Sequence, residues 1–270
     1  MFRRNFGEVR QVVKRLYREL SVSCFEPGYF ELAFSHEEDS GLNGIPVKGD
    51  RASGVLEGKV DRVDIWSHEG QTYYRVIDYK TGHVSFDYSG VYYGLGLQML
   101  IYLFALKEFE NKMDHEALSP AGVLYFPARC KSVSITTKDD EAKLRTAREN
   151  EEKSSGLLLN DPVVIHAMAP DETIRYLPCT VNAKGELKTY VATSQELELL
   201  RHHVTRKVSD LADSIYSGKL EPNPYFLDTN HYGCGWCPYK SVCGERAEQR
   251  VLDKLTPEMF WDRIREDSNV

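Results

Sequence analysis

The stretch from Gly58 to Lys80, GKVDRVDIWSHEGQTYYRVIDYK, constrains this chain more than any other segment. Apolar and polar residues alternate on both sides of a polar turn at residues 67–71, which predicts paired β-strands at about 55–66 and 72–80. Side chains alternate between the two faces of a strand, so Asp78 and Lys80 are expected on one face. Asp61 stands on the neighbouring strand. Two carboxylates beside an ammonium group are the parts of a plausible metal and nucleophile site.

The flanking segments indicate the fold class. Apolar spacing and turn signals predict helices at 4–20, 91–106, 137–154, 193–216 and 257–265, and strands at 29–34, 120–129, 163–165 and 189–192. The first helix is expected to bury one apolar face, and the fourth to begin at a Thr193/Glu196 capping box and to end at Gly218. This order predicts an α/β fold, in which helices flank a central mixed sheet.

Composition sets limits on the class of protein. The 270 residues are 41% hydrophobic and 28% charged, as in an ordinary globular protein. No apolar run approaches the roughly 18 residues of a membrane-spanning helix, and the N-terminus lacks the pattern of a signal peptide, so we expect a cytoplasmic protein with no membrane partner. A net charge of −7 argues weakly against nucleic-acid binding. It does not exclude it, because carboxylates that hold cations also make a chain acidic.

The carboxylates and the lysine suit phosphodiester hydrolysis. Divalent cations held by carboxylates stabilise charge on a phosphate, and a neighbouring lysine orients water and offsets charge in the transition state. An aspartate two residues before a lysine is nevertheless common. On the simpler interpretation, Asp78 and Lys80 form an exposed ion pair, and Arg62 and Asp64 are surface partners.

Three motifs in order carry a more specific signal. They are GKVDRVD at 58–64, IDYKTG at 77–82 and QMLIY at 98–102. Together they resemble the RecB-type nucleases of the PD-(D/E)XK superfamily, which implies a restriction-endonuclease-like core. By this resemblance Asp61, Asp78 and the backbone carbonyl of Tyr79 bind Mg²⁺ or Mn²⁺, and Lys80 is the catalytic lysine. The residues expected to position the DNA or support the site are Gln98 and Tyr102. Arg62 and Asp64 receive a supporting role.

One element of that family is missing. RecB-type nucleases usually carry an upstream helical histidine that adds a metal ligand, but the first histidine here is His36, after the strand at 29–34. Glu31 stands where family members often have an acidic residue. Two interpretations of Glu31 stay open, a substitute or supporting ligand and a surface residue of an edge strand.

A cysteine window follows at residues 234–243, CGWCPYKSVC. Cys234, Cys237 and Cys243 have the spacing and the following proline of iron–sulfur ligand runs. Zinc with His231 as fourth ligand, or three reduced thiols in a loop, are the alternatives. The window, with the motifs above, resembles the AddB family of helicase-nuclease subunits over nearly the whole chain.

The AddB resemblance implies a 4Fe-4S cluster whose fourth cysteine lies far upstream of the nuclease core. We therefore expect a C-terminal fragment beginning at an artificial Met1, with a nuclease core at 1–220 and a cysteine-bearing segment at 221–270. The cluster is expected to be incomplete or absent in this fragment. Cys24 is the nearest substitute ligand, whereas Cys130 and Cys179 are expected to be core or loop residues. The sequence contains no Walker-type phosphate-binding motif, so no ATP hydrolysis is expected.

The function expected by resemblance is that of a metal-dependent DNA exonuclease domain in double-strand break repair by homologous recombination. It would cut the 5′-ended strand, with an AddA-like A subunit as partner. The alternatives are a weakly active or inactive DNA-binding fragment of the same fold, and a CRISPR-associated RecB-like nuclease.

Overall fold

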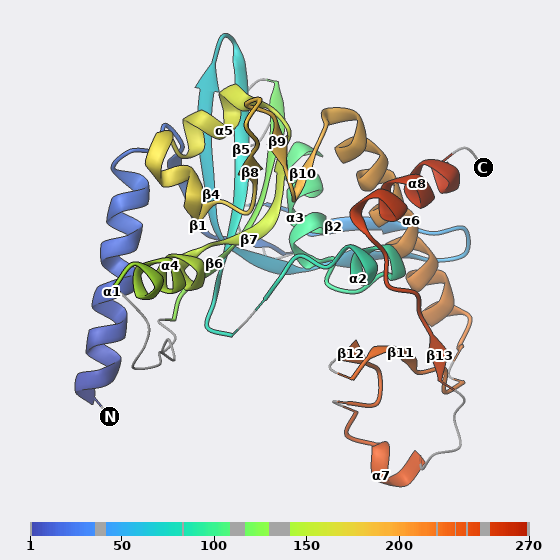
Figure 1. Ribbon diagram of the computed structural model, residues 1–270. Coiled ribbons are helices and arrows are strands. Elements are labelled where there is room, and N and C mark those ends of the chain that lie inside the picture. Colours follow the sequence, from blue (N-terminus) through green and yellow to red (C-terminus); the bar gives the residue numbers. More distant parts are fainter. Residues whose placement is uncertain are drawn as a thin grey trace. The chain divides into compact units, whose positions relative to one another are not determined.

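The computed structural model describes residues 2–35, 42–82, 84–108, 117–129, 141–219, 221–229, 231–235, 237–243 and 249–268 (Figure 1). The chain divides into two compact units. The first comprises Met1–Pro46, Val55–Phe86 and Leu97–Arg201, and the second comprises Val47–Gly54, Asp87–Gly96 and His202–Val270. The domain boundary expected between residues 220 and 221 stays a prediction.

A mixed sheet forms the centre of the first unit. Within the described residues it has six strands in the order β1-β4-β5-β6-β7-β10. Their bounds are β1 (Glu26–Phe34), β4 (Gly58–His68), β5 (Gln71–Lys80), β6 (Leu118–Pro127), β7 (Ser155–Leu159) and β10 (Val191–Ala192). The β5–β6 and β7–β10 pairs are parallel and the others antiparallel. The predicted α/β class with a mixed sheet is therefore confirmed.

The β4–β5 hairpin is the stretch on which the sequence argument began. Its strands pair from Arg62 opposite Ile77 to His68 opposite Gln71. Glu69 and Gly70 form the turn with φ of 50° and 78°, the positive values that match the twist of paired strands. Both predicted strands are confirmed.

Helices cover both faces of this hairpin. Tyr74 of β5 donates its hydroxyl to the Leu103 carbonyl of α3 (Gln98–Glu108) at 2.6 Å. The next residue, Arg75, points to the other face and donates to Glu19 of α1 (Phe2–Leu20) at 3.1 Å. Successive residues of a strand face opposite sides, so α3 and α1 flank the sheet as Figure 1 shows.

The helix α1 is packed differently from the prediction. Its apolar residues Phe6, Val9 and Val13 are exposed, whereas Arg15 is buried. The helix contacts the sheet through hydrogen bonds and ion pairs of Arg15 and Glu19 near its C-terminal end. The expectation of a buried apolar face was therefore wrong, because polar contacts rather than the apolar stripe anchor α1.

The expected long helix at 91–106 is two helices, α2 (Tyr88–Tyr93) and α3. Gly94 and Gly96 between them have φ of 92° and 63°, which is left-handed backbone that ends α2. The two glycines therefore break the single helix that the apolar pattern predicted.

Two expected strands also need correction. Residues 163–165 lie in the helix α5 (Pro162–Met168), where the Asp161 side chain caps the amides of Val163 and Val164 and proline occupies the first turn. Their apolar run is short enough to suit either structure, and the cap decides it. The strand expected at 189–192 is shortened to Val191–Ala192, because Thr189 and Tyr190 have positive φ of 61° and 50°.

The predicted helices at 137–154, 193–216 and 257–265 are confirmed for the described residues. They are α4 (Glu141–Glu152), α6 (Ser194–Tyr216) and α8 (Pro257–Ser268). Residues 137–140 lie outside the described residues. The capping box is present, since the Glu196 amide donates to Thr193 Oγ1 at 3.1 Å and the Thr193 amide to Glu196 Oε2 at 2.9 Å. No residue of α4 is buried, as expected of a surface helix.

In the second unit, α2 packs against α8. The Tyr88 and Phe260 rings lie 5.0 Å apart, and the Leu255 amide donates to Ser89 Oγ at 2.8 Å. The short elements of this unit are β11 (Tyr225–Asp228), β12 (His231–Tyr232), α7 (Lys240–Cys243) and β13 (Arg250–Val251). The first unit contains the 3-10 helix η2 (Asp171–Tyr176), β8 (Thr180–Val181) and β9 (Leu187–Lys188), and both units contribute residues to β2 (Ile45–Lys48) and β3 (Ser53–Leu56). Over the described ranges, every helix is too short or too polar to cross a membrane.

Candidate active site

Asp78 and Lys80 lie together near the end of β5. Lys80 Nζ is 2.6 Å from Asp78 Oδ2, and the lysine and aspartate side chains are 33% and 15% exposed. The pair is therefore neither sealed nor fully exposed. Each side chain keeps part of its surface accessible to solvent.

Asp61 approaches the same pair from β4. Its Oδ2 accepts a hydrogen bond of 2.8 Å from the Tyr79 amide, so its carboxylate lies against the backbone between Asp78 and Lys80. The β4–β5 ladder ends with Arg62 opposite Ile77. Asp61 precedes Arg62 and Asp78 follows Ile77, so both aspartates lie just beyond the last pair of the ladder. In this way the hairpin brings its two motifs together.

The third motif contributes Gln98 and Tyr102 from α3. Gln98 Nε2 donates to the Tyr102 hydroxyl at 3.2 Å, as the spacing of four residues predicts. Tyr102 stacks on Phe34 with ring centroids 5.6 Å apart. A β-carbon at Gly58 would collide with the Tyr102 hydroxyl, so glycine at the start of the first motif allows α3 to approach β4.

Tyr125 is a residue near this site that no motif indicated. It lies on β6 directly opposite Asp78 in the parallel β5–β6 pair. Burial, reinforced by the nearby charge of Asp78, raises the pKa of Tyr125 to about 12. Its phenol therefore stays a neutral hydrogen-bond donor at physiological pH. Only the strand register reveals this proximity, because the two residues are far apart in sequence.

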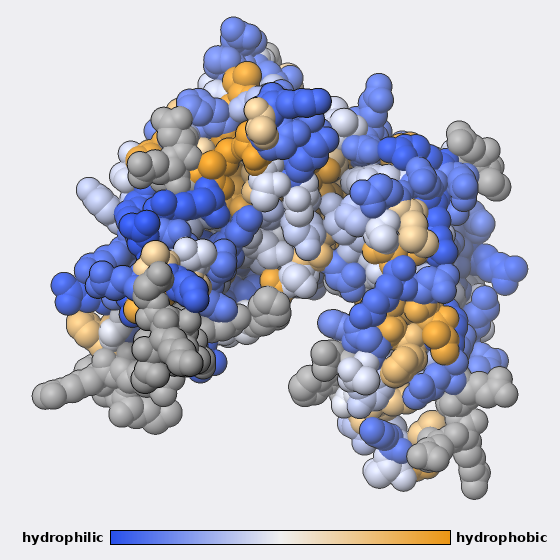
Figure 2. Space-filling view, in the orientation of Figure 1, coloured by the Kyte–Doolittle hydropathy of each residue, from blue (hydrophilic) through white to orange (hydrophobic). Residues whose placement is uncertain are grey.

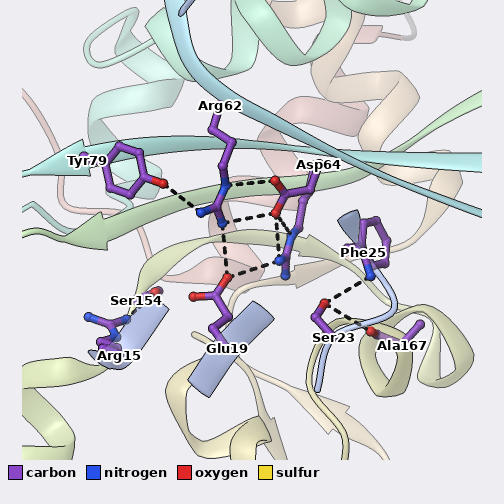
Figure 3. A network of polar contacts seen from close by, with 10 residues as sticks. Arg15, Glu19, Ser23, Phe25, Arg62, Asp64, Tyr79, Ser154 and Ala167 are labelled. Atoms are coloured by element: carbon purple, nitrogen blue, oxygen red, sulfur yellow. Dashed lines mark hydrogen bonds and ion pairs between the residues drawn. The ribbon is translucent and has the colours of Figure 1, made fainter. Parts of the chain in front are cut away.

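The opposite face of the hairpin holds a buried charged cluster (Figure 3). Asp64 is completely buried, and its Oδ1 lies 2.8 Å from Arg62 Nε while its Oδ2 lies 2.8 Å from an Arg75 nitrogen. Glu19 of α1 completes the cluster with contacts of 3.3 Å to Arg62 and 3.1 Å to Arg75. Two cations are thus balanced by two carboxylates. The interpretation of Arg62 and Asp64 as surface partners is wrong.

Ion pairs within this cluster favour the charged form of Arg62. Burial disfavours the charged form of Arg62, but attraction to Asp64 and Glu19 outweighs it and raises the Arg62 pKa. Arg62 also donates to the Tyr79 hydroxyl at 2.7 Å. Tyr79 therefore contacts the buried cluster through its side chain and Asp61 through its backbone.

The donor set beside Lys80 fits a hard divalent cation. Asp61 and Asp78 offer carboxylate oxygens, which Mg²⁺ and Mn²⁺ prefer. Among the described residues, no group of three or more His, Cys, Asp or Glu side chains is placed to hold a metal ion. The ligand set implied by the resemblance, Asp61, Asp78 and the Tyr79 carbonyl, stays a prediction.

Glu31, the acidic residue considered as a substitute or supporting ligand, lies on the strand β1. Glu31 is exposed on the edge strand β1 and pairs with Lys59 at 2.6 Å, an interaction that raises the Lys59 pKa. That position favours the surface interpretation of Glu31. His36 lies outside the described residues.

The cysteine window lies in the second unit. Cys234 and Cys237 are half-buried and Cys243 is exposed at the end of α7. His231 is paired with Asp228 through Nδ1 at 2.9 Å. Where the chain is described, these thiols do not converge with a further donor as a metal site would require. Cys179 is buried, as expected, and Cys130 lies outside the described residues.

Fold and site together define a class of protein. The mixed sheet carries an aspartate and a lysine at the end of a central strand and a second aspartate on the strand beside it. The family model of the PD-(D/E)XK nuclease superfamily matches residues 3–244 of the chain. The chain belongs to this superfamily.

Comparison with individual proteins identifies a narrower family within this superfamily. The chain is 33% identical over 251 residues to the B subunit of the ATP-dependent helicase/deoxyribonuclease of Clostridium kluyveri, covering 89% of this chain and 22% of the relative. It is 30% identical over 235 residues to the protein of that name from Listeria welshimeri, covering 85% and 20%. The resemblance to the AddB family is therefore confirmed. The chain spans about a fifth of the length of these relatives.

Proposed function

We propose that this chain is a divalent-metal-dependent deoxyribonuclease domain. The observation that carries the proposal is the half-open pair of Asp78 and Lys80, with Asp61 held against the Tyr79 amide, in a chain of the PD-(D/E)XK superfamily. A divalent cation bound by Asp61, Asp78 and the Tyr79 carbonyl would supply positive charge to the scissile phosphate.

The chain's own residues have separate roles in this proposal. The Lys80 ammonium group, fixed by Asp78, orients the attacking water and offsets negative charge in the transition state. The Tyr79 amide holds the Asp61 carboxylate in one orientation. Gln98 and Tyr102, linked by their hydrogen bond, position the DNA strand beside the pair.

The test is DNA degradation with Mg²⁺ or Mn²⁺. We compare the wild type with Asp78→Asn and Lys80→Gln, both in the 270-residue chain and in a full-length protein assembled with a partner whose own nuclease is disabled. Both variants are expected to lose at least about a hundredfold in rate, and EDTA to abolish degradation. Lys188→Gln is the control, because Lys188 is an exposed lysine in a similar ion pair with Glu186. Wild-type rates in both site variants would overturn the assignment.

We further propose that the domain works within a helicase-nuclease that repairs double-strand breaks by recombination. The relatives are named as the B subunit of an ATP-dependent helicase/deoxyribonuclease, which supports a partner A subunit and a DNA substrate. The family resemblance supports exonuclease action on the 5′-ended strand. Duplexes labelled on one strand at a time test the polarity, since preferential loss of the 3′-ended strand would contradict it.

The cysteine window is proposed to ligate a 4Fe-4S cluster. Cys234, Cys237 and Cys243 supply three thiolates, so one iron requires another donor. Iron and acid-labile sulfide in the anaerobically purified full-length protein test this, with Cys237→Ser as the variant. Zinc in place of iron would contradict the proposal.

A further inference from the structure

A groove leads away from Lys80 along the first unit. Its near part is a hollow lined by Lys80, Tyr125 and Lys153, with residues of the segment after β5. Its far part is a hollow lined by α1 and α4 residues, including Lys14 and Arg148. Three residues, Pro127, Arg129 and Glu151, line both hollows, so the two adjoin one another. We call these adjoining hollows the Lys80–α1 groove.

The groove is basic in a chain that is acidic. Its cationic residues are Lys14, Arg15, Arg18, Lys80, Arg129, Arg148 and Lys153, and its acidic residues are Glu151 and Glu152. Glu152 is already paired with Arg18 at 3.3 Å. The chain as a whole carries −7, so this local excess of positive charge does not follow from composition. Figure 2 shows predominantly hydrophilic side chains over α4 and the adjacent part of α1.

The floor of the groove is formed in part by Arg15, which several contacts hold in place. Arg15 is buried, donates to the Pro127 carbonyl at 3.3 Å and to Ser154 Oγ at 3.0 Å, and lies over the Phe126 ring at 3.9 Å. Above this floor Arg129 and Arg148 are exposed. Tyr17 of α1 also lines the far part and is 74% exposed. The groove thus offers exposed arginines together with an accessible aromatic ring.

We propose that the Lys80–α1 groove binds the backbone of single-stranded DNA and leads the strand to Lys80. This inference rests on the proposed nuclease function and deepens it. A positive groove that follows the phosphates, with an aromatic side chain on which a base stacks, is the way proteins bind single strands without sequence preference. Tyr17 favours a single strand over a duplex, because the bases of a duplex are already stacked on one another.

Binding is measured without cleavage. Fluorescence anisotropy follows a labelled thymidine oligomer of about 20 nucleotides added to the 270-residue chain in EDTA. The double variant Arg129→Glu/Arg148→Glu is compared with Lys143→Glu/Arg145→Glu. The control residues lie on α4 and are exposed, but they do not line the groove, and the change in net charge is the same.

The groove variant is expected to bind at least about tenfold more weakly, and its salt dependence to fall by about 1.4 in slope, roughly 0.7 for each lost phosphate contact. The control is expected to bind like the wild type. Tyr17→Ala is expected to weaken binding about tenfold with an unchanged salt slope. Equal binding by groove variant and wild type, or an equal loss in the control, would overturn the proposal. A duplex bound as tightly as the oligomer through the same residues would overturn its single-strand part.

The outcomes separate this proposal from the nuclease assignment. Degradation that depends on Asp78 and Lys80, with binding indifferent to Arg129 and Arg148, would refute the groove alone. Binding that depends on the groove, in a chain and full-length complex that degrade no DNA, would refute the nuclease alone.

Discussion

The two faces of the β4–β5 hairpin both carry carboxylates beside cations, but only one face is closed. On the α1 side, Arg62, Asp64 and Arg75 are at most 1% exposed and form ion pairs with one another. On the other side, Asp78 and Lys80 are partly exposed and form an ion pair with each other.

This difference in burial predicts different roles for the two groups of charged residues. A buried, mutually paired cluster costs desolvation energy and is strongly destabilised when one member is removed. A partly exposed pair contributes little to stability but leaves oxygen atoms free for a cation or a substrate. We therefore expect motif residues of similar chemistry to have different roles, depending on the face they occupy.

The largest change in the free energy of unfolding is expected from substitution of Asp64. Asp64→Ala leaves Arg62 and Arg75 buried with only Glu19 as counter-charge, so we expect a loss of about 3–5 kcal/mol in the free energy of unfolding. Urea denaturation measures it. Asp78→Ala is the matched control, since it removes a carboxylate from the open face and is expected to cost less than about 1 kcal/mol. Similar losses in both variants would remove the distinction between the faces.

A smaller effect is expected at Gly58. Gly58→Ala forces the Tyr102 hydroxyl and α3 away from β4, at a cost of about 1–3 kcal/mol in unfolding free energy, with reduced nuclease activity because the open face is displaced. Gly54→Ala is the control, because a β-carbon there meets no atom within 4 Å. Full activity in Gly58→Ala would show that the α3 contact does not position the site.

Substitution of Tyr125 tests whether β6 contributes to the site formed by Asp78 and Lys80. Tyr125→Phe removes a neutral donor near Asp78, and we expect activity to fall about tenfold, the equivalent of one hydrogen bond. A raised phenol pKa means that the proton is retained as pH rises, until about 12. Wild type and variant are therefore expected to have pH profiles of the same shape up to about pH 10. An alkaline limb that disappears in Tyr125→Phe would contradict this role.

The smallest effect is expected at Tyr79, which touches both faces. Tyr79→Phe removes the 2.7 Å hydrogen bond from Arg62 but keeps the amide that holds Asp61. We expect a loss of about 1 kcal/mol in unfolding free energy and unchanged nuclease activity. A loss of activity without a loss of stability would show that the buried charged cluster controls the Asp78–Lys80 pair.

The sequence by itself determined the hairpin, the mixed-sheet class and the joining of Asp78 to Lys80. These depend on local periodicity and on turn residues, which act over a few positions. It also determined that Gln98 and Tyr102 are neighbours, because helical spacing is local.

Only the tertiary structure decided which charges are buried. Arg62 and Asp64 follow Asp61 within one motif, yet their burial depends on Glu19, more than forty positions away in the chain. Tyr125 came near Asp78 through the register of β5 with β6, and the Lys80–α1 groove through residues from α1, β6 and α4. Charge burial and grooves arise from contacts between distant segments, and such contacts leave no periodic pattern in the sequence.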